Sequence, residues 1–345
     1  MLRLMVATWS RRRSARHVVA LGAGAALVLC SAACTGGSTS TTDTGTGSPS
    51  LAAASGLART DAQAVGRTTI REAKLAATVQ GDLDRFGRRV AALRPVVAAL
   101  YAHVAALQRA AGVEEGPLLS PTPPPAVTPA GAVRRTALAL DAAALAAARP
   151  TVDQLAPVGG PVAGLLASVA ASDTALAAVL RGTGGGAPTA GPAVTAPTGS
   201  SVDALQAALT GEYAAVYAYG VVGGQLAAHG APTSELDQAR SGLDTHVQRR
   251  DRLIVMIQAA GGAADPGAGG YALAFPVDSA ASARRLAGLV EARCAGNYAQ
   301  LVVGARPPAA RRESVSWLRD AAVRQSGWTA VAPALPGLQP PPPTS

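Results

Sequence analysis

The stretch GEYAAVYAYG, residues 211–220, places one carboxylate and three tyrosines in what is otherwise an apolar helix. Leu205, Leu209 and Glu212 follow one another at steps of four and three, the spacing of a single helix face. A lone charge is expelled from an apolar core unless it forms an ion pair or binds a ligand. The groups that meet Glu212 therefore decide what the centre of this fold contains.

Four amphipathic helices are predicted around this stretch, and Gly or Pro residues separate them. They cover about residues 201–229, 233–260, 279–304 and 309–328. The connection between the second and third is long, whereas the others are short, as in ferritin-like bundles. We therefore expect an all-α protein whose residues 201–333 form a ferritin-like four-helix bundle.

The remainder of the chain divides by composition. We expect a signal peptide at 1–33, a flexible tether at 34–56, an Ala-rich helical region at 57–181, a Gly/Pro/Thr linker at 182–200 and a Pro-rich tail at 334–345. Pro95 predicts a kink or break within the helical region. His103 has no obvious partner in the sequence, so it is interpreted as a residue of the surface or the core edge.

The first 33 residues resemble an export signal. Five arginines and no acidic residue precede or adjoin the apolar stretch VVALGAGAALVLC, which is short for a membrane span. The following SAAC ends at Cys34 and resembles the lipobox of bacterial lipoproteins, in which the cysteine carries acyl chains such as palmitate. We expect a lipid anchor at Cys34 on the extracytoplasmic face of the cell membrane. A cleaved signal peptide without lipid, or an uncleaved anchor, are the alternatives, and Sec and twin-arginine export both stay open.

The centre of the predicted bundle collects polar side chains from three helices. Glu212, His246, Arg250, Asp251 and Glu291 fall on or beside the apolar stripes. Buried charges in such bundles usually occur as satisfied pairs. The preferred interpretation is an ion-pair and hydrogen-bond network that fixes how the helices pack.

The same polar centre admits two other interpretations. A di-iron or di-manganese site would use Glu212, His246 and Glu291, but it needs Glu-x-x-His on two helices; Leu243 replaces one of those Glu residues and the fourth helix has no histidine. A small-molecule pocket would be lined by Tyr213, Tyr217 and Tyr219. We therefore expect no metal or other cofactor, with iron or manganese as the alternative.

Four blocks of residues carry a resemblance to an uncharacterised ferritin-like domain family of actinobacterial proteins. They are GEYAAVYAYGVVGGQL, THVQRRDRLIVMIQAAGG, GYALAFPVDSAASARRLAGLVEARCAGNYAQLV and LRDAAVRQSGWTAVA, which together span about residues 201–333. The family pattern maps onto Glu212, Tyr217, Tyr219, Gly220, His246, Arg249, Arg250, Asp251, Tyr271, Phe275 and Pro276. Tyr213 and Ala274 stand where the family often has His and Pro. The resemblance implies the fold but supplies no reaction.

Composition and missing motifs limit the function. The net charge of +9 includes the arginines of the leader, and no basic run interleaved with aromatic residues occurs, so nucleic-acid binding is not expected. The motifs of serine hydrolases and phosphate-binding loops are missing. We expect a non-enzymatic scaffold or binding module on the membrane, with a metal-dependent oxidoreductase or iron-handling protein as the alternative. The protein or cell-wall partner, and assembly into a homo-oligomer, stay open.

Overall fold

Every regular element in the part of the chain that the structure describes is a helix, so the all-α fold class is confirmed. The structure, a computed structural model, describes residues 56–113, 128–182, 202–305, 308 and 311–338. The α-helices are α2 (Arg59–Phe86), α3 (Arg94–Ala110), α4 (Pro129–Ala148), α5 (Gly160–Arg181), α6 (Val202–Ala228), α7 (Thr233–Ala259), α8 (Ala280–Gly304) and α9 (Arg311–Thr329). Two 3-10 helices are η1 (Gly87–Leu93) and η2 (Arg149–Val152).

The N-terminal bundle, α2 to α5, begins with two helices joined by a sharp turn. Gly87 ends α2 with φ +54°, and Val90 within η1 is also non-helical. Pro95 lies in the first turn of α3, where its missing N–H costs nothing. The predicted break in this helical stretch is present, but it falls several residues before Pro95, where a glycine can adopt positive φ.

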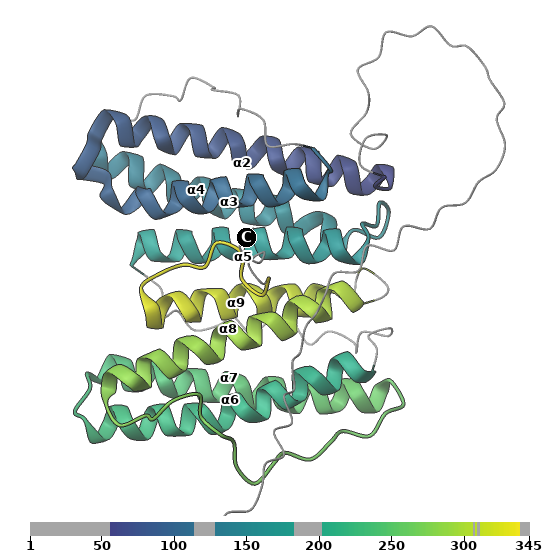
Figure 1. The fold of residues 1–345 in the computed structure, drawn as a ribbon, viewed down its shortest axis with the longest axis vertical. Coiled ribbons are helices and arrows are strands. Elements are labelled where there is room, and N and C mark those ends of the chain that lie inside the picture. The colour runs from purple at the N-terminus through teal and green to yellow at the C-terminus, as the bar shows by residue number, and fades with distance from the viewer. Residues whose placement is uncertain (1–55, 114–127, 183–201, 306–307, 309–310, 339–345) are drawn as a thin grey trace, which may run out of the picture. The chain divides into compact units, whose positions relative to one another are not determined.

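Helix α5 packs against α4 on one side and against α8 and α9 on the other (Figure 1). Its buried residues lie all around its circumference, as expected for a helix between two layers. By length and composition, both the α2–α3 stretch (59–110) and α5 could cross a membrane, but their apolar windows are 50% and 83% buried within the protein. Packing between layers accounts for the apolar character of α5.

The C-terminal bundle, α6 to α9, follows the predicted order of helices. Gly230, with φ +64°, ends the first helical segment, and Ser279 caps α8 in a reciprocal capping box with Ser282. Residues 260–279 form the long connection from α7 to α8, where Arg285 lies 4.3 Å from the centre of the Phe275 ring. The sequence thus predicted each helix of this bundle to within a few residues.

Close backbone packing joins α5 to α8. A Cβ on Gly160 would lie 2.3 Å from the Val303 carbonyl oxygen, so only glycine fits there. Nearby, the fully buried Arg311 at the start of α9 donates to the carbonyls of Val158, at 2.8 Å, and Thr151, at 3.3 Å. These contacts lock the segment that precedes α5 onto the C-terminal bundle.

The segment after α9 runs back along α5, as the yellow trace in Figure 1 shows, and its end contacts α8. Ser168 of α5 donates to the Pro336 carbonyl at 2.9 Å in a buried hydrogen bond. Gly337 has φ +77°, and a Cβ there would lie 2.5 Å from the Ala295 carbonyl oxygen. Residues 334–338 were predicted to belong to a Pro-rich tail, but they pack against the helices; residues 339–345 lie outside the described part.

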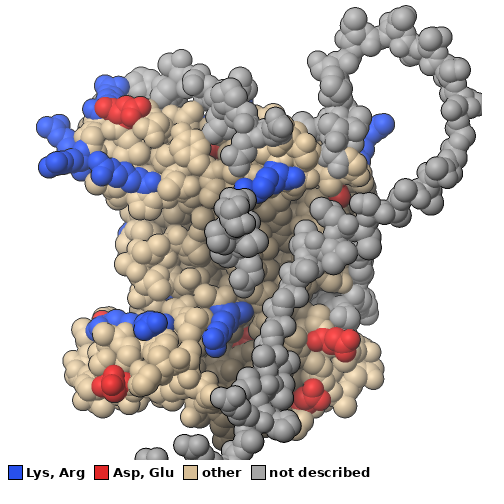
Figure 2. Space-filling view, viewed as in Figure 1, with Lys and Arg blue, Asp and Glu red and all other residues tan. Residues whose placement is uncertain are grey.

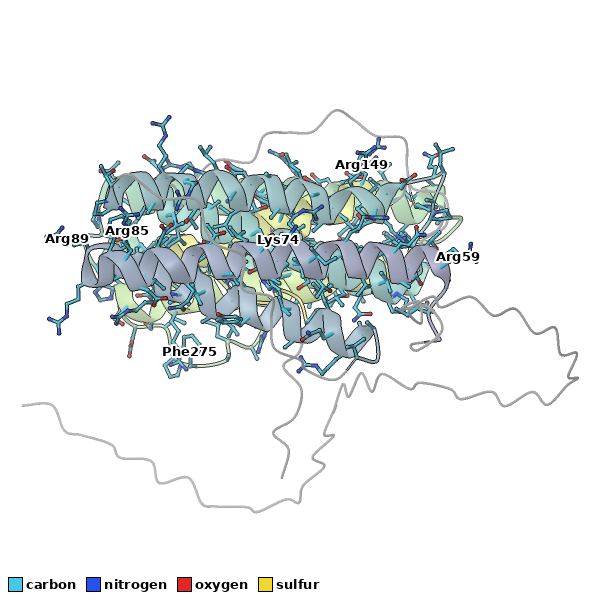
Figure 3. The ribbon with its side chains drawn as sticks, turned by 90° about the horizontal axis from the view of Figure 1, so that it is seen from above. Arg59, Lys74, Arg85, Arg89, Arg149 and Phe275 are labelled. Carbon is cyan, nitrogen blue, oxygen red and sulfur yellow. The ribbon has the colours of Figure 1, made fainter. Side chains whose placement is uncertain are left out.

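Charged side chains stand apart from this interior. Figure 2 shows Lys and Arg in small separate groups on the visible face, with uncharged surface between them. In Figure 3, Arg59 and Arg89 mark opposite ends of the α2–η1 stretch and project away from the ribbon. The buried charged side chains include Arg311, described above, and two groups that each surround a buried histidine.

Candidate functional site

The first of these two groups is the C-terminal cluster, defined as Glu212 of α6, His246 of α7 and Glu291 of α8. All three side chains are at most 1% exposed. The imidazole stands between the two carboxylates: His246 Nδ1 is 2.8 Å from Glu212 Oε2, and Nε2 is 3.3 Å from Glu291 Oε1. The structure thus brings together three of the five residues predicted from the sequence.

Two tyrosines hold the carboxylates in place. Tyr298 donates its hydroxyl proton to Glu212 Oε1, and Tyr219 donates to Glu291 Oε1 at 2.6 Å. Burial raises the pKa of both phenols well above the usual value, so both stay protonated donors. Trp328 Nε1 in turn donates to the Tyr219 hydroxyl at 3.0 Å. Each carboxylate is therefore oriented by an aromatic side chain as well as by His246.

Arg249 connects the cluster to α9. Its guanidinium donates to the Tyr298 hydroxyl at 3.2 Å and to Asp320, and it lies 5.1 Å from the centre of the Tyr298 ring. Asp320 also accepts a hydrogen bond from Arg324 at 3.0 Å. Burial opposes ionisation of Asp320, but these two guanidinium groups hold its pKa below the usual value. A second ion pair therefore extends the network across the bundle.

The protonation of His246 determines the charge balance of the C-terminal cluster. Burial disfavours its protonation, but the carboxylates of Glu291 and Glu212 outweigh burial and raise its pKa to about 9. At neutral pH the ring is thus an imidazolium that donates from both nitrogens. Three cationic side chains then face three carboxylates in this interior: His246, Arg249 and Arg324 against Glu212, Glu291 and Asp320.

Two residues predicted for this centre lie elsewhere. Arg250 and Asp251 pair with each other at 2.7 Å, and their side chains are 28% and 58% exposed. The inward face of α7 runs through His246, Arg249 and Leu253. The spacing from His246 and Leu253 admits both 249 and 250, and the structure places Arg249 inside, with a side chain that is 7% exposed. The buried arginine is therefore Arg249.

The three tyrosines proposed to line one pocket point to different places. Tyr219 is buried in the cluster, whereas Tyr217 is 40% exposed and packs against Tyr271 with ring centres 5.7 Å apart. Tyr213 is half-buried, and a Cβ on Gly267 would meet its ring at 2.7 Å. The three tyrosines therefore do not line one pocket: Tyr213 and Tyr217, four residues apart, face the connection between α7 and α8, whereas Tyr219 points into the cluster.

The residues of this bundle do not fit the di-metal centre that a ferritin-like fold would imply. That centre needs carboxylates on all four helices and two histidines, whereas α9 contributes Asp320 already held by two arginines. Donor atoms of Glu212, His246 and Cys294 do lie within 4.8 Å of one another. However, burial raises the pKa of the Cys294 thiol well above the usual value, which keeps it protonated, and the imidazolium has no free lone pair.

A second cluster, which the sequence did not predict, lies in the N-terminal bundle. The N-terminal cluster consists of Glu72 of α2, His103 of α3 and Asp173 of α5, and all three are 0% exposed. His103 Nδ1 is 2.9 Å from Glu72 Oε2 and 3.7 Å from Asp173 Oδ1. The expectation of a lone surface or core-edge His103 is wrong. The available signal was its place in the apolar stripe of α3, beside Leu100 and Leu107.

The N-terminal cluster is less completely bonded than the C-terminal one. Three carboxylate oxygens of this cluster have no hydrogen-bond partner among the described residues: both oxygens of Asp173 and Oε1 of Glu72. Burial and the neighbouring Glu72 raise the pKa of Asp173 well above the usual value, against a smaller opposite effect of Arg71 and Arg319. His103 Nε2 is 2.7 Å from the Ala334 carbonyl oxygen of the C-terminal segment.

Comparison with known proteins gives a family but no activity. Residues 204–340 match the model of a domain of unknown function, DUF4439. The chain is 34% identical to a conserved hypothetical protein from Mycobacterium tuberculosis of known crystal structure; the match covers 37% of this chain and 94% of that chain, with a TM-score of 0.35. No curated protein matches the chain. Cys34, the predicted lipidation site, lies outside the described residues.

Proposed function

We propose that the chain, which carries a DUF4439 domain at residues 204–340, is a lipid-anchored scaffold or binding module of the cell envelope. Its C-terminal bundle would be a ferritin-like fold whose centre is held by side chains and not by metal ions. The observation that supports this most strongly is His246, whose two ring nitrogens are both engaged by carboxylates, those of Glu212 and Glu291.

The ferritin-like assignment is supported by the order and connections of the helices. The pairs α6–α7 and α8–α9 are each joined by a short segment, whereas residues 260–279 form one long crossover between α7 and α8. One long crossover with short loops elsewhere is the ferritin-like form of a four-helix bundle.

The structural role of the C-terminal cluster is supported by its charge balance. A divalent cation would have to displace the proton of His246 and approach the guanidinium of Arg249, which lies against Tyr298. Both steps oppose binding, because like charges repel strongly where water is excluded. The cluster instead joins α6, α7, α8 and α9 through hydrogen bonds, as expected for a buried polar network that favours one packing arrangement.

The metal-free centre is tested by metal analysis of the full chain, purified without chelators, beside Glu212→Gln and Glu291→Gln variants. We expect any bound metal to be the same in all three proteins, because neither carboxylate is a ligand. Loss of iron or manganese in both variants would support the alternative function, a metal-binding oxidoreductase or iron-handling protein, for which the proximity of Glu212, His246 and Cys294 is the favouring observation.

The lipid anchor is tested independently in the cells that make the protein. A Cys34→Ser variant should lose incorporated acyl chain and leave the membrane fraction, whereas a Cys30→Ser variant should behave like the parent. Cys30 is a suitable control because it lies in the same leader but follows Leu29, not a small residue. Equal membrane retention of the Cys34→Ser protein and the parent would argue for a different form of anchoring.

A further inference from the structure

We propose that Glu72, His103 and Asp173 form a binding site for one divalent transition-metal ion, of the zinc or manganese class, inside the N-terminal bundle. The site would lie outside the DUF4439 domain, except for one carbonyl of the C-terminal segment. It is separate from the scaffold role of the C-terminal cluster and does not depend on it.

The donor atoms already stand close to the spacing of a coordination sphere. His103 Nδ1 is 2.9 Å from Glu72 Oε2 and 3.7 Å from Asp173 Oδ1, and one ligand atom from each of the three residues lies within 4.8 Å of the others. Ligands around tetrahedral zinc, with bonds of about 2.1 Å, are about 3.4 Å apart. Small side-chain movements would therefore suffice for all three to reach one ion.

The tautomer of His103 is set by the C-terminal segment. The Ala334 carbonyl oxygen can only accept a hydrogen bond, so Nε2, 2.7 Å away, must carry a proton. Nδ1 is then the nitrogen that faces the carboxylates, and a metal ion would displace the proton of its hydrogen bond with Glu72 Oε2, 2.9 Å away. A metal-binding histidine usually donates its other N–H to a carbonyl or carboxylate in this way, which fixes the orientation of the ring.

Unpartnered carboxylate oxygens in the N-terminal cluster favour the binding of a cation. Glu72 Oε1 and both oxygens of Asp173 are buried without a hydrogen-bond partner among the described residues. The arginine that faces Asp173 from α9, Arg319, donates instead to the hydroxyl of Thr174 at 3.0 Å. Buried carboxylates are normally paired or coordinate metals, and a divalent ion would engage the unpartnered oxygens and balance both charges.

The composition of the site selects the kind of ion. One imidazole nitrogen with two carboxylates suits zinc, manganese or iron, whereas calcium and magnesium prefer all-oxygen sites with more ligands. Three protein ligands leave further coordination positions for water or a small anion. The C-terminal cluster differs in its carboxylates, because Glu212 and Glu291 already accept hydrogen bonds from Tyr298 and Tyr219.

The test is calorimetric titration of the full chain with zinc and with manganese after treatment with a chelator, with magnesium as a control ion. We expect one zinc or manganese site per chain and no magnesium binding at the same concentration. Asp173→Asn and Glu72→Gln should each weaken binding by more than about 100-fold, which exceeds the loss expected when a residue only orients a ligand. Glu291→Gln, the matched change in the other cluster, should leave the affinity unchanged.

Cobalt(II) provides a spectroscopic check that does not depend on affinity. Bound cobalt should show visible bands without a thiolate charge-transfer band, because the N-terminal cluster contains no cysteine. Absence of zinc and manganese binding in the folded parent would overturn the proposal. So would binding that survives Asp173→Asn and Glu72→Gln but is lost in Glu291→Gln, or a cobalt–thiolate band, since these results place the ion at Cys294 and the C-terminal cluster.

Discussion

The two bundles each bury one histidine against a glutamate from the preceding helix, with nearly the same spacing of 2.9 Å in the pair Glu72–His103 and 2.8 Å in Glu212–His246. They differ at the other ring nitrogen, which meets the Ala334 carbonyl in the N-terminal cluster and the Glu291 carboxylate in the C-terminal one. Each bundle therefore contains a buried Glu–His pair, but the second ring nitrogen of the histidine bonds to a carbonyl in one bundle and to a carboxylate in the other.

The surroundings extend this difference. Tyr298 and Tyr219 donate to Glu212 and Glu291, and among the described residues only Oε2 of Glu291 in this cluster lacks a partner, whereas both oxygens of Asp173 and Oε1 of Glu72 lack one. A buried polar group that lacks a partner costs about 1–3 kcal/mol, and more when it is charged. We conclude that the C-terminal cluster contributes stability and that the N-terminal cluster reduces it unless a ligand binds.

The largest expected effect comes from removing the cation that links α7 to α9. Arg249→Ala should lower the free energy of unfolding by about 3–5 kcal/mol, because it leaves Asp320 and Glu212 with less compensation in the core. Arg250→Ala is the matched control next to it and should change stability by no more than about 0.5 kcal/mol. Urea denaturation measures both, and equal effects of the two changes would mean that Arg249 is not the buried partner.

The pH dependence of stability should report the charged state of His246. Its pKa is raised from 6.5 to about 9 on folding, so the stabilisation is fully present below pH 6.5 and is lost as the pH rises through 9. The loss amounts to about 3 kcal/mol, from 1.36 kcal/mol per pKa unit. Urea denaturation at pH 6 and at pH 9.5 should show this loss in the parent and not in His246→Gln; parallel curves for the two proteins would contradict it.

Matched amide substitutions should act in opposite directions in the two clusters. Asp173→Asn should raise the free energy of unfolding at pH 7 in metal-free buffer by about 1–2 kcal/mol, because the folded chain no longer holds a carboxyl that resists ionisation. Glu291→Gln should lower it by a similar amount, since His246 loses a charged partner.

The pH provides the control for this pair of variants. The pKa of Asp173 is raised on folding, so its cost appears only above the pKa of the unfolded carboxyl, and the gain in Asp173→Asn should shrink at pH 4. Two destabilising substitutions at pH 7 would remove the contrast between the clusters.

The smallest effect concerns the C-terminal segment. Ser168→Ala removes the buried hydrogen bond to the Pro336 carbonyl and should cost about 1 kcal/mol. Since the same segment positions His103 through Ala334, the change should also accelerate amide exchange in residues 334–338. Unchanged exchange there would show that Ser168 does not hold the segment in place.

The sequence predicted the helices of the C-terminal bundle well, because Gly230 and Ser279 punctuate strong apolar periodicity. It also predicted that Glu212, His246 and Glu291 meet. It selected Arg250 over Arg249, since one position of error in helical phase turns a side chain by about 100°. In the sequence, the orientation of this helix could be judged only from the apolar stripe through His246 and Leu253. That stripe is compatible with either Arg249 or Arg250 facing inward.

The N-terminal cluster could not be found in this way. Glu72, His103 and Asp173 come from three different helices, and the Ala-rich stripes of this region do not specify which helix faces meet. Asp173 is a lone acid in an apolar helix, which was a usable signal, but its partners follow only from the tertiary fold. The packing of residues 334–338 against the helices could not be predicted either, because a proline-rich composition is typical of an extended tail.

The central claim, that the C-terminal cluster neutralises itself, is tested most directly by nitrogen NMR of the His246 ring in the metal-free full chain at pH 7. We predict that both ring nitrogens carry protons and that the ring titrates with a pKa of about 9. A neutral ring at pH 7, with one unprotonated nitrogen facing Glu212 or Glu291, would contradict the account and would make His246 available as a metal ligand.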